Sequence, residues 1–364
     1  MLDIKFIREH QKEVEKNLVF RGSKVSLAEI LSLDEKRRKL IFQIEEIRAI
    51  RNQTPAEKPT PEQLEELKLK KEGLKKLETK FDIVDKEFLD KLARIPNMSS
   101  PDMPEGRGDP DHVELAVWIP ESGYLPKEKL GLGLNSAQYM PKKIGKHHVD
   151  LGKDLDIIDI EQSAVTSGSR FAYLKGDGAL LQYALFELLK NKLITEGFEP
   201  MIVPVLVKEQ VLFGTSHFPE GRDQVYEIKT EFVEDNNQLF LVGSSEPSLF
   251  AYYMNKTLDK KDLPKKFFAF THCFRSEVGS WGKDVRGIKR VHQFDKLEMD
   301  LLASEDNSRE MMEYLRGINE WVMQQLRLPY RIINKCSWDC GYNATYLQYD
   351  LEVWLPTQCE FIEL

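Results

Sequence analysis

Long hydrophobic runs are missing from this sequence, in which no stretch approaches the roughly 18 apolar residues that a membrane-spanning helix needs. The first residues, MLDIKFIREHQKEVEKN, are charged from the start and do not form a secretory signal. Cysteine is scarce, with four irregularly placed residues, Cys273, Cys336, Cys340 and Cys359. This usage disfavours a disulfide scaffold and a zinc site, and we predict a cytoplasmic protein.

An excess of positive charge is also missing, because 52 basic and 60 acidic residues give a net charge of −8. A basic surface over the whole molecule is therefore excluded, and nucleic-acid binding would need a local basic element. No Ser-His-Asp or Cys-His constellation for nucleophilic catalysis is visible. What remains is an ordinary globular composition, with 31% charged and 41% hydrophobic residues. Its 364 residues are enough for two or more domains.

Residues 35–80 supply a local basic element, with 13 basic and 9 acidic residues. Seam residues recur there and nearby at steps of three and four: Leu33, Arg37, Leu40, Ile44, Ile47 and Arg51, then Leu67, Leu74, Leu77, Phe81, Val84 and Phe88. This spacing predicts two helices, joined at NQTPAEKP, that form an antiparallel coiled-coil arm over about 26–95. Such an arm suits a phosphate backbone, and a coiled coil that merely dimerises is the alternative.

The stretch from Phe267 to Asp300, FFAFTHCFRSEVGSWGKDVRGIKRVHQFDKLEMD, predicts a long β-hairpin. Its two flanks are rich in aromatic and β-branched residues, which are typical of strands. Between the flanks lie Gly279, Gly282 and Gly287 with polar neighbours, the composition of a loop. We expect the rest of the chain to be organised around this hairpin.

Alternation of side chains across a strand predicts which hairpin residues share a face. Arg275 and Glu277 lie on one face of the first strand, and Arg290, Phe294 and Glu298 lie on one face of the second. A surface with two guanidinium groups, carboxylates and a flat ring suits a nucleotide, through phosphate contacts, base stacking and amine recognition. A hairpin with a solvated ladder of ion pairs is the alternative.

FRSE, the glycine-rich loop and RGIKRVHQFDKLEM together resemble the second signature motif of class II aminoacyl-tRNA synthetases, in the form found in seryl-tRNA synthetases. The resemblance extends over nearly the whole chain. It implies an α+β fold, with an N-terminal tRNA-binding domain (1–107) that carries the helical arm. A catalytic domain (108–364) with an antiparallel sheet flanked by helices follows. A Pro/Gly/Asp-rich linker at 96–112 marks the boundary.

The resemblance also implies an activity, serine–tRNA ligation: serine is activated by ATP with Mg²⁺ and transferred to tRNA(Ser), with tRNA(Sec) as a further acceptor. It places Arg275 on the α-phosphate, Glu277 on the adenine amine and Phe294 against the adenine. Arg290 is a second phosphate or carboxylate clamp. The implied ATP-binding residues are Arg275, Ser276, Glu277, Val291, Phe294 and Glu363, with Glu363 on the metal. The implied serine-binding residues are Ser244, Glu246 and Glu298, and which carboxylate holds the hydroxyl stays open.

Other segments fit the same family with some departures. GFEPMIVPVLV (197–207) resembles the first class II motif, which implies a homodimer interface. LFLVGSSEPSLF has Ser244 where the family usually has threonine, and Ile362 replaces the usual arginine before Glu363. Residues 113–146 are longer than the family's join, and we predict no function for them. The third motif, which supplies an arginine for the terminal ATP phosphates, is absent up to residue 364, so we expect a C-terminally incomplete form.

Three other functions compete with a serine–tRNA ligase. A tRNA-binding protein that has lost catalysis is favoured by the absent third motif, whereas the intact hairpin set disfavours it. An amino acid:carrier-protein ligase would lack the tRNA arm. A purely structural coiled-coil protein would not need the set of residues on one face of the hairpin.

Overall fold

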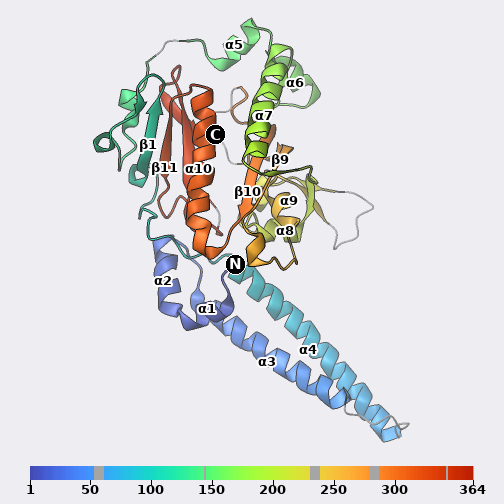
Figure 1. The fold of residues 1–364 in the computed structure, drawn as a ribbon. Coiled ribbons are helices and arrows are strands. Elements are labelled where there is room, and N and C mark those ends of the chain that lie inside the picture. Colours follow the sequence, from blue (N-terminus) through green and yellow to red (C-terminus); the bar gives the residue numbers. More distant parts are fainter. Residues whose placement is uncertain (53–60, 143–144, 230–237, 279–286, 342, 364) are drawn as a thin grey trace. The chain divides into compact units, whose positions relative to one another are not determined.

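The computed structural model describes residues 1–364 except 53–60, 143–144, 230–237, 279–286, 342 and 364 (Figure 1). The chain forms two compact units. The first comprises Met1–Glu105 and Cys340–Tyr346, and the second comprises Gly106–Asp339 and Leu347–Leu364. No helix within the described ranges combines the length and the apolar composition that crossing a membrane requires.

The first unit is helical, with α1 (Ile4–Glu9), α2 (Gln11–Phe20), α3 (Leu27–Asn52) and α4 (Pro61–Ala93). The side chain of Ser26 accepts a hydrogen bond from the Glu29 N–H at 3.4 Å, so the predicted cap begins α3. One apolar cluster holds the unit together at the base of the arm: Ile7, Val14, Leu18, Leu27, Ile30, Leu33, Phe88, Leu92 and Ile95.

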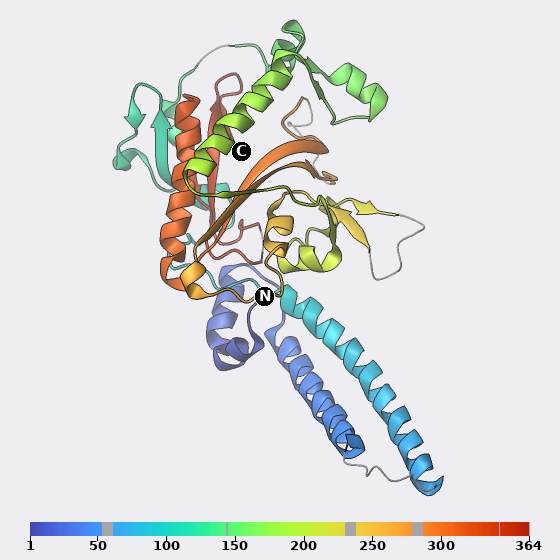
Figure 2. The ribbon, with the colours of Figure 1, turned by 45° about the vertical axis from the view of Figure 1, so that its right-hand side comes forward.

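The arm consists of α3 and α4, which lie side by side over their length (Figures 1 and 2). Leu33, Ile44, Leu74 and Phe88 of the predicted seam are buried between them. Pairs of opposite charge flank the seam, with Arg48 Nη2 at 2.8 Å from Glu78 Oε1 and Lys91 Nζ at 2.8 Å from Glu29 Oε2. Exposed pairs of this kind contribute little stability, so the buried apolar seam is the main source of cohesion.

The short segment Cys340–Tyr346 belongs to the first unit although it is far away in the sequence. The Asn97 N–H donates to the Asn343 carbonyl at 2.6 Å, and the Ser100 N–H donates to the Tyr346 carbonyl at 2.8 Å. Arg21 Nη1 donates to the Thr345 carbonyl at 2.8 Å. A division of the sequence at residue 107 does not foresee this return, because no local pattern marks it.

The second unit contains the predicted hairpin, formed by β9 (Lys265–Phe274) and β10 (Gln293–Leu302). The strands pair antiparallel, from Phe274 opposite Gln293 to Lys265 opposite Leu302. The short strand β5 (Glu199–Met201) pairs with β9 in parallel, so the sheet order is β10-β9-β5 and β5 is an edge. Figure 2 shows the hairpin as a long curved pair of orange strands.

A second, five-stranded sheet has the order β13-β12-β11-β1-β2, and all of its pairings are antiparallel. Its strands are β1 (Val113–Ile119), β2 (Gly123–Tyr124), β11 (Tyr330–Asn334), β12 (Tyr349–Leu355) and β13 (Glu360–Glu363). The predicted strands at 330–335 and 349–355 are therefore present. Residues 113–146, for which we predict no function, supply β1 and β2 and extend this sheet.

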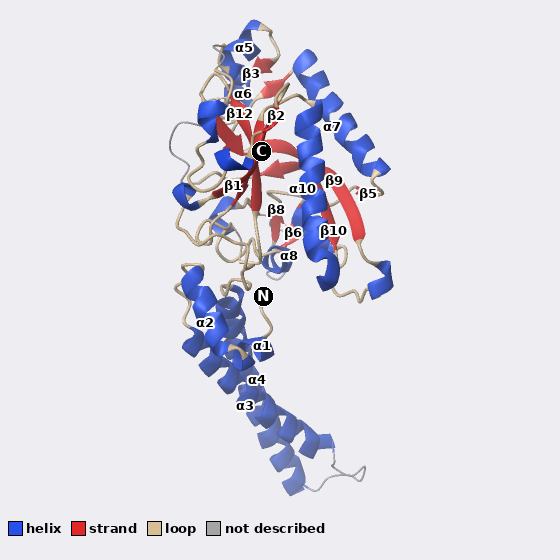
Figure 3. Cartoon of the chain, turned by 60° about the vertical axis from the view of Figure 1, so that its left-hand side comes forward, coloured by secondary structure: helices blue, strands red, loops and turns tan. Residues whose placement is uncertain are grey.

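Two long helices, α7 (Asp177–Thr195) and α10 (Ser308–Gln325), lie against the strands (Figure 3). Ile318 of α10 packs with Leu193 of α7 and Phe268 of β9, whereas Val322 packs with Tyr330 of the second sheet. The amphipathic helix predicted at 305–327 thus joins the two sheets through one apolar stripe.

The remaining elements of the second unit are short. They are α5 (His148–Asp154), β3 (Ile158–Asp159), α6 (Ile160–Thr166), β4 (Tyr173–Leu174), β6 (Leu206–Lys208), α8 (Glu209–Gly214), β7 (Glu227–Ile228), β8 (Leu239–Leu241) and α9 (Glu246–Ala251). The interruption predicted at Pro204 separates β5 from β6. The strands β6, β8 and β7 form a small sheet beside the hairpin, and α9 begins at the turn that follows β8.

Candidate functional site

The mouth of the hairpin carries an arginine over an aromatic ring. Arg275 follows β9 directly, and its N–H donates to the His292 carbonyl at 3.0 Å, which extends the ladder by one residue. Its guanidinium carbon lies 5.2 Å from the centre of the Phe294 ring, and its Nε donates to the Gly243 carbonyl at 3.3 Å. The predicted common face of Arg275 and Phe294 is therefore confirmed. The guanidinium keeps further N–H groups for an anion.

Glu277 and Arg290 form the outer end of this surface, where Arg290 Nε lies 3.3 Å from Glu277 Oε2. The strands end before them, so the prediction that Arg275, Glu277 and Arg290 lie within the strands is wrong. The physical reason is that Glu277 adopts a left-handed backbone conformation, with φ of 52°, which stops the alternation. Ser276 is anchored to a neighbouring turn, because its N–H donates to the Gln224 carbonyl at 2.9 Å.

An acidic notch lies deeper on the same face of β10. Ser244, in the turn before α9, donates a hydrogen bond from its hydroxyl to Glu298 Oε2 at 2.6 Å. Lys296, one step nearer the mouth of the hairpin, forms an ion pair with Glu298 and lies 3.2 Å from the Ser244 hydroxyl. Burial acts against the charge of Lys296, but Glu298 holds the pKa of this lysine above its ordinary value. The predicted pair Ser244 and Glu298 is thus brought together.

Two more carboxyl groups line the notch, Glu246 at the start of α9 and Asp300 on β10. Burial and the charge of Glu298 raise the pKa of Glu246 to about 7. Burial, Glu298 and Glu246 together raise the pKa of Asp300 to about 8. Three carboxyl groups therefore surround one lysine, an arrangement that suits a small cationic ligand.

Sequence reasoning missed three residues of the notch: Lys296, Asp300 and His217. The first two share the face of Phe294 and Glu298 by the same alternation, so the pattern contained their signal. His217 follows α8 and carries no such signal. Burial, aided by the positive charges of Arg275 and Lys296, lowers the pKa of His217 to about 4, so the imidazole is neutral at pH 7.

Glu363 on β13 lies opposite Glu352, at the edge of the second sheet. Although its side chain reaches solvent, the surrounding protein atoms and the charge of Asp350 raise its pKa. A cluster of carboxyl groups whose charges repel each other fits a hard divalent cation such as Mg²⁺, which prefers oxygen ligands. Arg275 lowers the pKa of Glu363, so its charge reaches this carboxyl group.

Val291 projects to the other face of β10 from Phe294 by alternation, yet both residues line one cavity of about 450 Å³ beside the hairpin. Gln182 and Asp295 also line this cavity and form a hydrogen bond with each other. The predicted position of Val291 along the ATP site remains a prediction.

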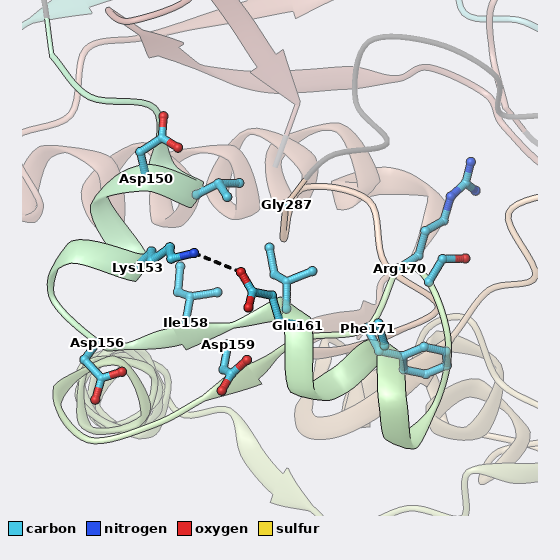
Figure 4. Close-up of a pocket in the computed structure, with 13 residues that line it drawn as sticks. Asp150, Lys153, Asp156, Ile158, Asp159, Glu161, Arg170, Phe171 and Gly287 are labelled. Atoms are coloured by element: carbon cyan, nitrogen blue, oxygen red, sulfur yellow. Dashed lines mark hydrogen bonds and ion pairs between the residues drawn. The ribbon is translucent and has the colours of Figure 1, made fainter.

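A larger cavity of about 700 Å³ lies near the base of the hairpin loop, between α5, α6 and Gly287 (Figure 4). Lys153 Nζ donates to Glu161 Oε1 at 2.9 Å on one side, and Arg170 lies at the other end. Gly287 has φ of 102°, and a Cβ atom there would approach His148 Nε2 to 1.9 Å. Only glycine therefore fits at this position, where the Ile288 N–H donates to His148 Nε2 at 3.2 Å.

Asp109, His112 and Asp339 place donor atoms within 4.8 Å of one another, a spacing that a metal ion could bridge. The Cys336 N–H donates to His112 Nδ1 at 3.2 Å, so the ring proton resides on Nε2. That proton points to Asp339 Oδ2 at 3.0 Å. Both ring nitrogens are therefore occupied by hydrogen bonds, and the cluster is a structural contact.

The hairpin and its notch combine an arginine over a ring with a buried set of carboxylates, which is a site for a nucleotide beside a small ammonium compound. Residues 226–364 match the family model of the tRNA synthetase class II core domain (G, H, P, S and T). The fold and the site thus define a class II aminoacyl-tRNA synthetase core. Residues 1–99 match the model of the seryl-tRNA synthetase N-terminal domain.

Whole-chain comparisons agree with these matches. The serine–tRNA ligase of Dictyoglomus turgidum is 34% identical, and the match covers 100% of this chain and 82% of the relative. The seryl-tRNA synthetase of Pyrococcus horikoshii, solved with ATP, superimposes with a TM-score of 0.81 at 33% identity, covering 100% of this chain and 83% of the other. The cytoplasmic enzyme of Naegleria fowleri, solved with AMP, gives 0.77 at 27%, covering 100% and 81%.

The chain belongs to the seryl-tRNA synthetase family. The predicted family, fold class and enzyme class, a serine–tRNA ligase, are confirmed by these relatives. They give no support to the carrier-protein ligase or to the inactive tRNA-binding protein.

Proposed function

We propose that this chain activates serine with ATP at the hairpin and its acidic notch, and then transfers the seryl group to tRNA. The observation that carries this proposal is the shared face of β10, on which Phe294 with Arg275 lies next to Glu298 with Ser244 and Lys296. Exchange of labelled pyrophosphate into ATP tests it. Incorporation that requires serine is expected, and incorporation without any amino acid requirement would contradict it.

In the first step, a carboxylate oxygen of serine attacks the α-phosphorus of ATP and the bond to the β-phosphate oxygen breaks. Pyrophosphate leaves, and seryl-adenylate remains. Arg275 would neutralise charge on the α-phosphate, and the Phe294 ring would stack on adenine while Glu277 accepts from its amine. Positioning and charge neutralisation suffice for such a displacement, so no protein nucleophile is needed.

Serine would bind with its ammonium group among the carboxylates and its hydroxyl among polar partners of the notch. Ser244, Glu246 and Glu298 supply these partners, and Lys296 keeps Glu298 charged. Alanine would leave buried polar groups unpaired, so we expect it to be rejected strongly. In the second step, a terminal ribose hydroxyl of the tRNA attacks the seryl carbonyl and AMP leaves.

Mg²⁺ would be held by Glu363, with the neighbouring carboxyl groups adding negative charge. When bound, the ion would neutralise phosphate charge during the displacement. Arg290 would act from the outer end of the hairpin as a second clamp on phosphate or carboxylate, once it exchanges its ion pair with Glu277 for the substrate.

The arm formed by α3 and α4 is the proposed tRNA contact, because its basic residues outnumber its acidic ones in an acidic chain. Replacing residues 35–80 by a short turn should weaken tRNA(Ser) binding and flatten its dependence on salt, because fewer counterions are released. Filter binding at several salt concentrations measures both effects. An unchanged slope of log Kd against log salt would exclude the arm as the RNA contact. The same assay with tRNA(Sec) tests the second proposed acceptor, and these substrates place the activity in the cytoplasm.

A homodimer through the first class II motif is proposed from an apolar surface beside the edge strand β5. Ile202 is fully exposed, and Leu180, Leu181 and Tyr183 of α7 are each about 60% exposed. Large exposed side chains next to an unpaired strand edge are typical of an interface between subunits.

Charging this surface should prevent the dimer. We expect the double variant Leu181→Lys/Ile202→Lys to elute as a monomer in size-exclusion chromatography with light scattering, because burying two ammonium groups is costly. Leu132→Lys, which changes another exposed leucine of the same unit, is the matched control and should stay dimeric. A dimer that persists in the double variant would place the interface elsewhere.

A further inference from the structure

Asp300 is a buried carboxyl group beside the serine pocket that the proposed reaction does not yet use. It lies two residues beyond Glu298 on β10, on the same face and roughly 7 Å farther along the strand. Phe267 lies opposite on β9, and the Asp300 residue is only 8% exposed. Within the described part of the chain, its Oδ2 has no hydrogen-bond partner.

An unpaired carboxyl oxygen in such a place is costly unless the group is neutral or a ligand reaches it. The charged groups that act on Asp300 are Glu298 and Lys296 on its own strand and Glu246 at the start of α9. Its neighbour across the hairpin, Phe267, is apolar. His217 and Arg275 complete the surroundings of the notch and act on Lys296 or Glu298 rather than on Asp300.

The charges of the notch do not balance without a ligand. Lys296 is already paired with Glu298, so Glu246 and Asp300 face each other without a cation of their own. Two buried carboxyl groups that repel each other cannot both ionise at neutral pH and therefore retain a proton. The directions agree, because both groups have a raised pKa, about 7 for Glu246 and about 8 for Asp300.

We propose that Asp300 and Glu246 hold a shared proton in the serine-free pocket, and that the ammonium group of serine displaces it on binding. This inference rests on the proposed serine pocket. The carboxylic O–H bond breaks, the proton passes to solvent, and the ammonium ion takes over the neutralising charge. Asp300 is thereby a positioning residue that acts through Glu246, and it makes serine affinity depend on pH.

The sign of this dependence follows from proton release. The serine-free state binds more protons than the complex, so affinity rises with pH. With pKa values of about 8 and about 7, the pair carries about one proton at pH 7.5, and Glu246 alone would carry about a quarter. The dissociation constant for serine should therefore fall about tenfold per pH unit around pH 7.5.

Isothermal titration of the full chain with L-serine measures the proton count directly, when it is repeated in buffers of different ionisation enthalpy. The wild type should release close to one proton per serine at pH 7.5. Asp300→Asn, which is nearly isosteric, should release about a quarter of a proton, with a correspondingly flatter pH profile. Asp306→Asn changes an exposed carboxylate beyond the strand and should behave like the wild type.

Asp300→Leu provides a second variant, because leucine suits the apolar neighbours Phe267 and Leu302. It should also lose the proton release while keeping its fold by circular dichroism. Equal proton release in the wild type and in both folded variants would overturn the inference. Serine binding by the wild type without proton release would overturn it too, while leaving the serine pocket intact. If the wild type bound no serine, the proposed pocket itself would fall.

Discussion

Replacement of Glu298 by alanine is expected to lower serine-dependent pyrophosphate exchange by at least about a thousandfold. The carboxylate accepts from Ser244 and neutralises Lys296, so its removal leaves a buried ammonium group without its partner and an incoming serine without an acceptor. The serine ammonium group and Lys296 would then repel each other. Steady-state exchange kinetics, with serine and ATP varied in turn, measures the loss.

Two controls separate this loss from a general loss of folding. Glu298→Gln keeps the volume of the side chain and should also be inactive, while its thermal midpoint stays closer to that of the wild type. Glu305→Ala changes an exposed carboxylate just beyond β10 and should retain full exchange. Binding of tRNA should be nearly unchanged in Glu298→Ala. Exchange at the wild-type rate in that variant would remove Glu298 from the pocket.

Arg275→Ala should reduce the rate of exchange by about a thousandfold or more, with a smaller effect on serine binding. The guanidinium is fixed over Phe294 and held by the Gly243 carbonyl, so its remaining N–H groups meet phosphate oxygens without reorganisation. Arg275→Lys should recover little activity, because an ammonium group cannot reproduce the planar, bidentate geometry.

The matched control for this variant is Arg327→Ala, which removes an exposed arginine that pairs with Glu121 at the surface. Pre-steady-state quenching separates adenylate formation from ATP binding. The loss should appear in the rate of adenylate formation. A loss confined to the affinity for serine would contradict a phosphate contact by Arg275.

Alternation along the hairpin allowed much of the site to be predicted, because a strand presents every second side chain to one face. The rule places Phe294 and Glu298 together, and applied fully it also includes Lys296 and Asp300. It fails at Glu277, whose left-handed backbone is not visible in a pattern of residue types. Propensities describe regular strands and do not describe the turn that ends them.

Residues that reach the site from distant segments were accessible only through family resemblance or not at all. Ser244 and Glu246 lie in a short turn that reads by itself as a helix cap. His217 follows a six-residue helix and carries no pattern, and its surroundings exist only in the folded chain. The return of Cys340–Tyr346 to the helical unit depends on backbone hydrogen bonds, which no side-chain pattern encodes.

A crystal structure of the chain with a sulfamoyl analogue of seryl-adenylate is the measurement that decides the central claim. The adenine should stack on Phe294, the sulfamoyl group should contact Arg275, and the seryl ammonium should lie within hydrogen-bond distance of Glu298 or Glu246. Density for the analogue away from the hairpin, or a seryl group that points out of the acidic notch, would contradict the account.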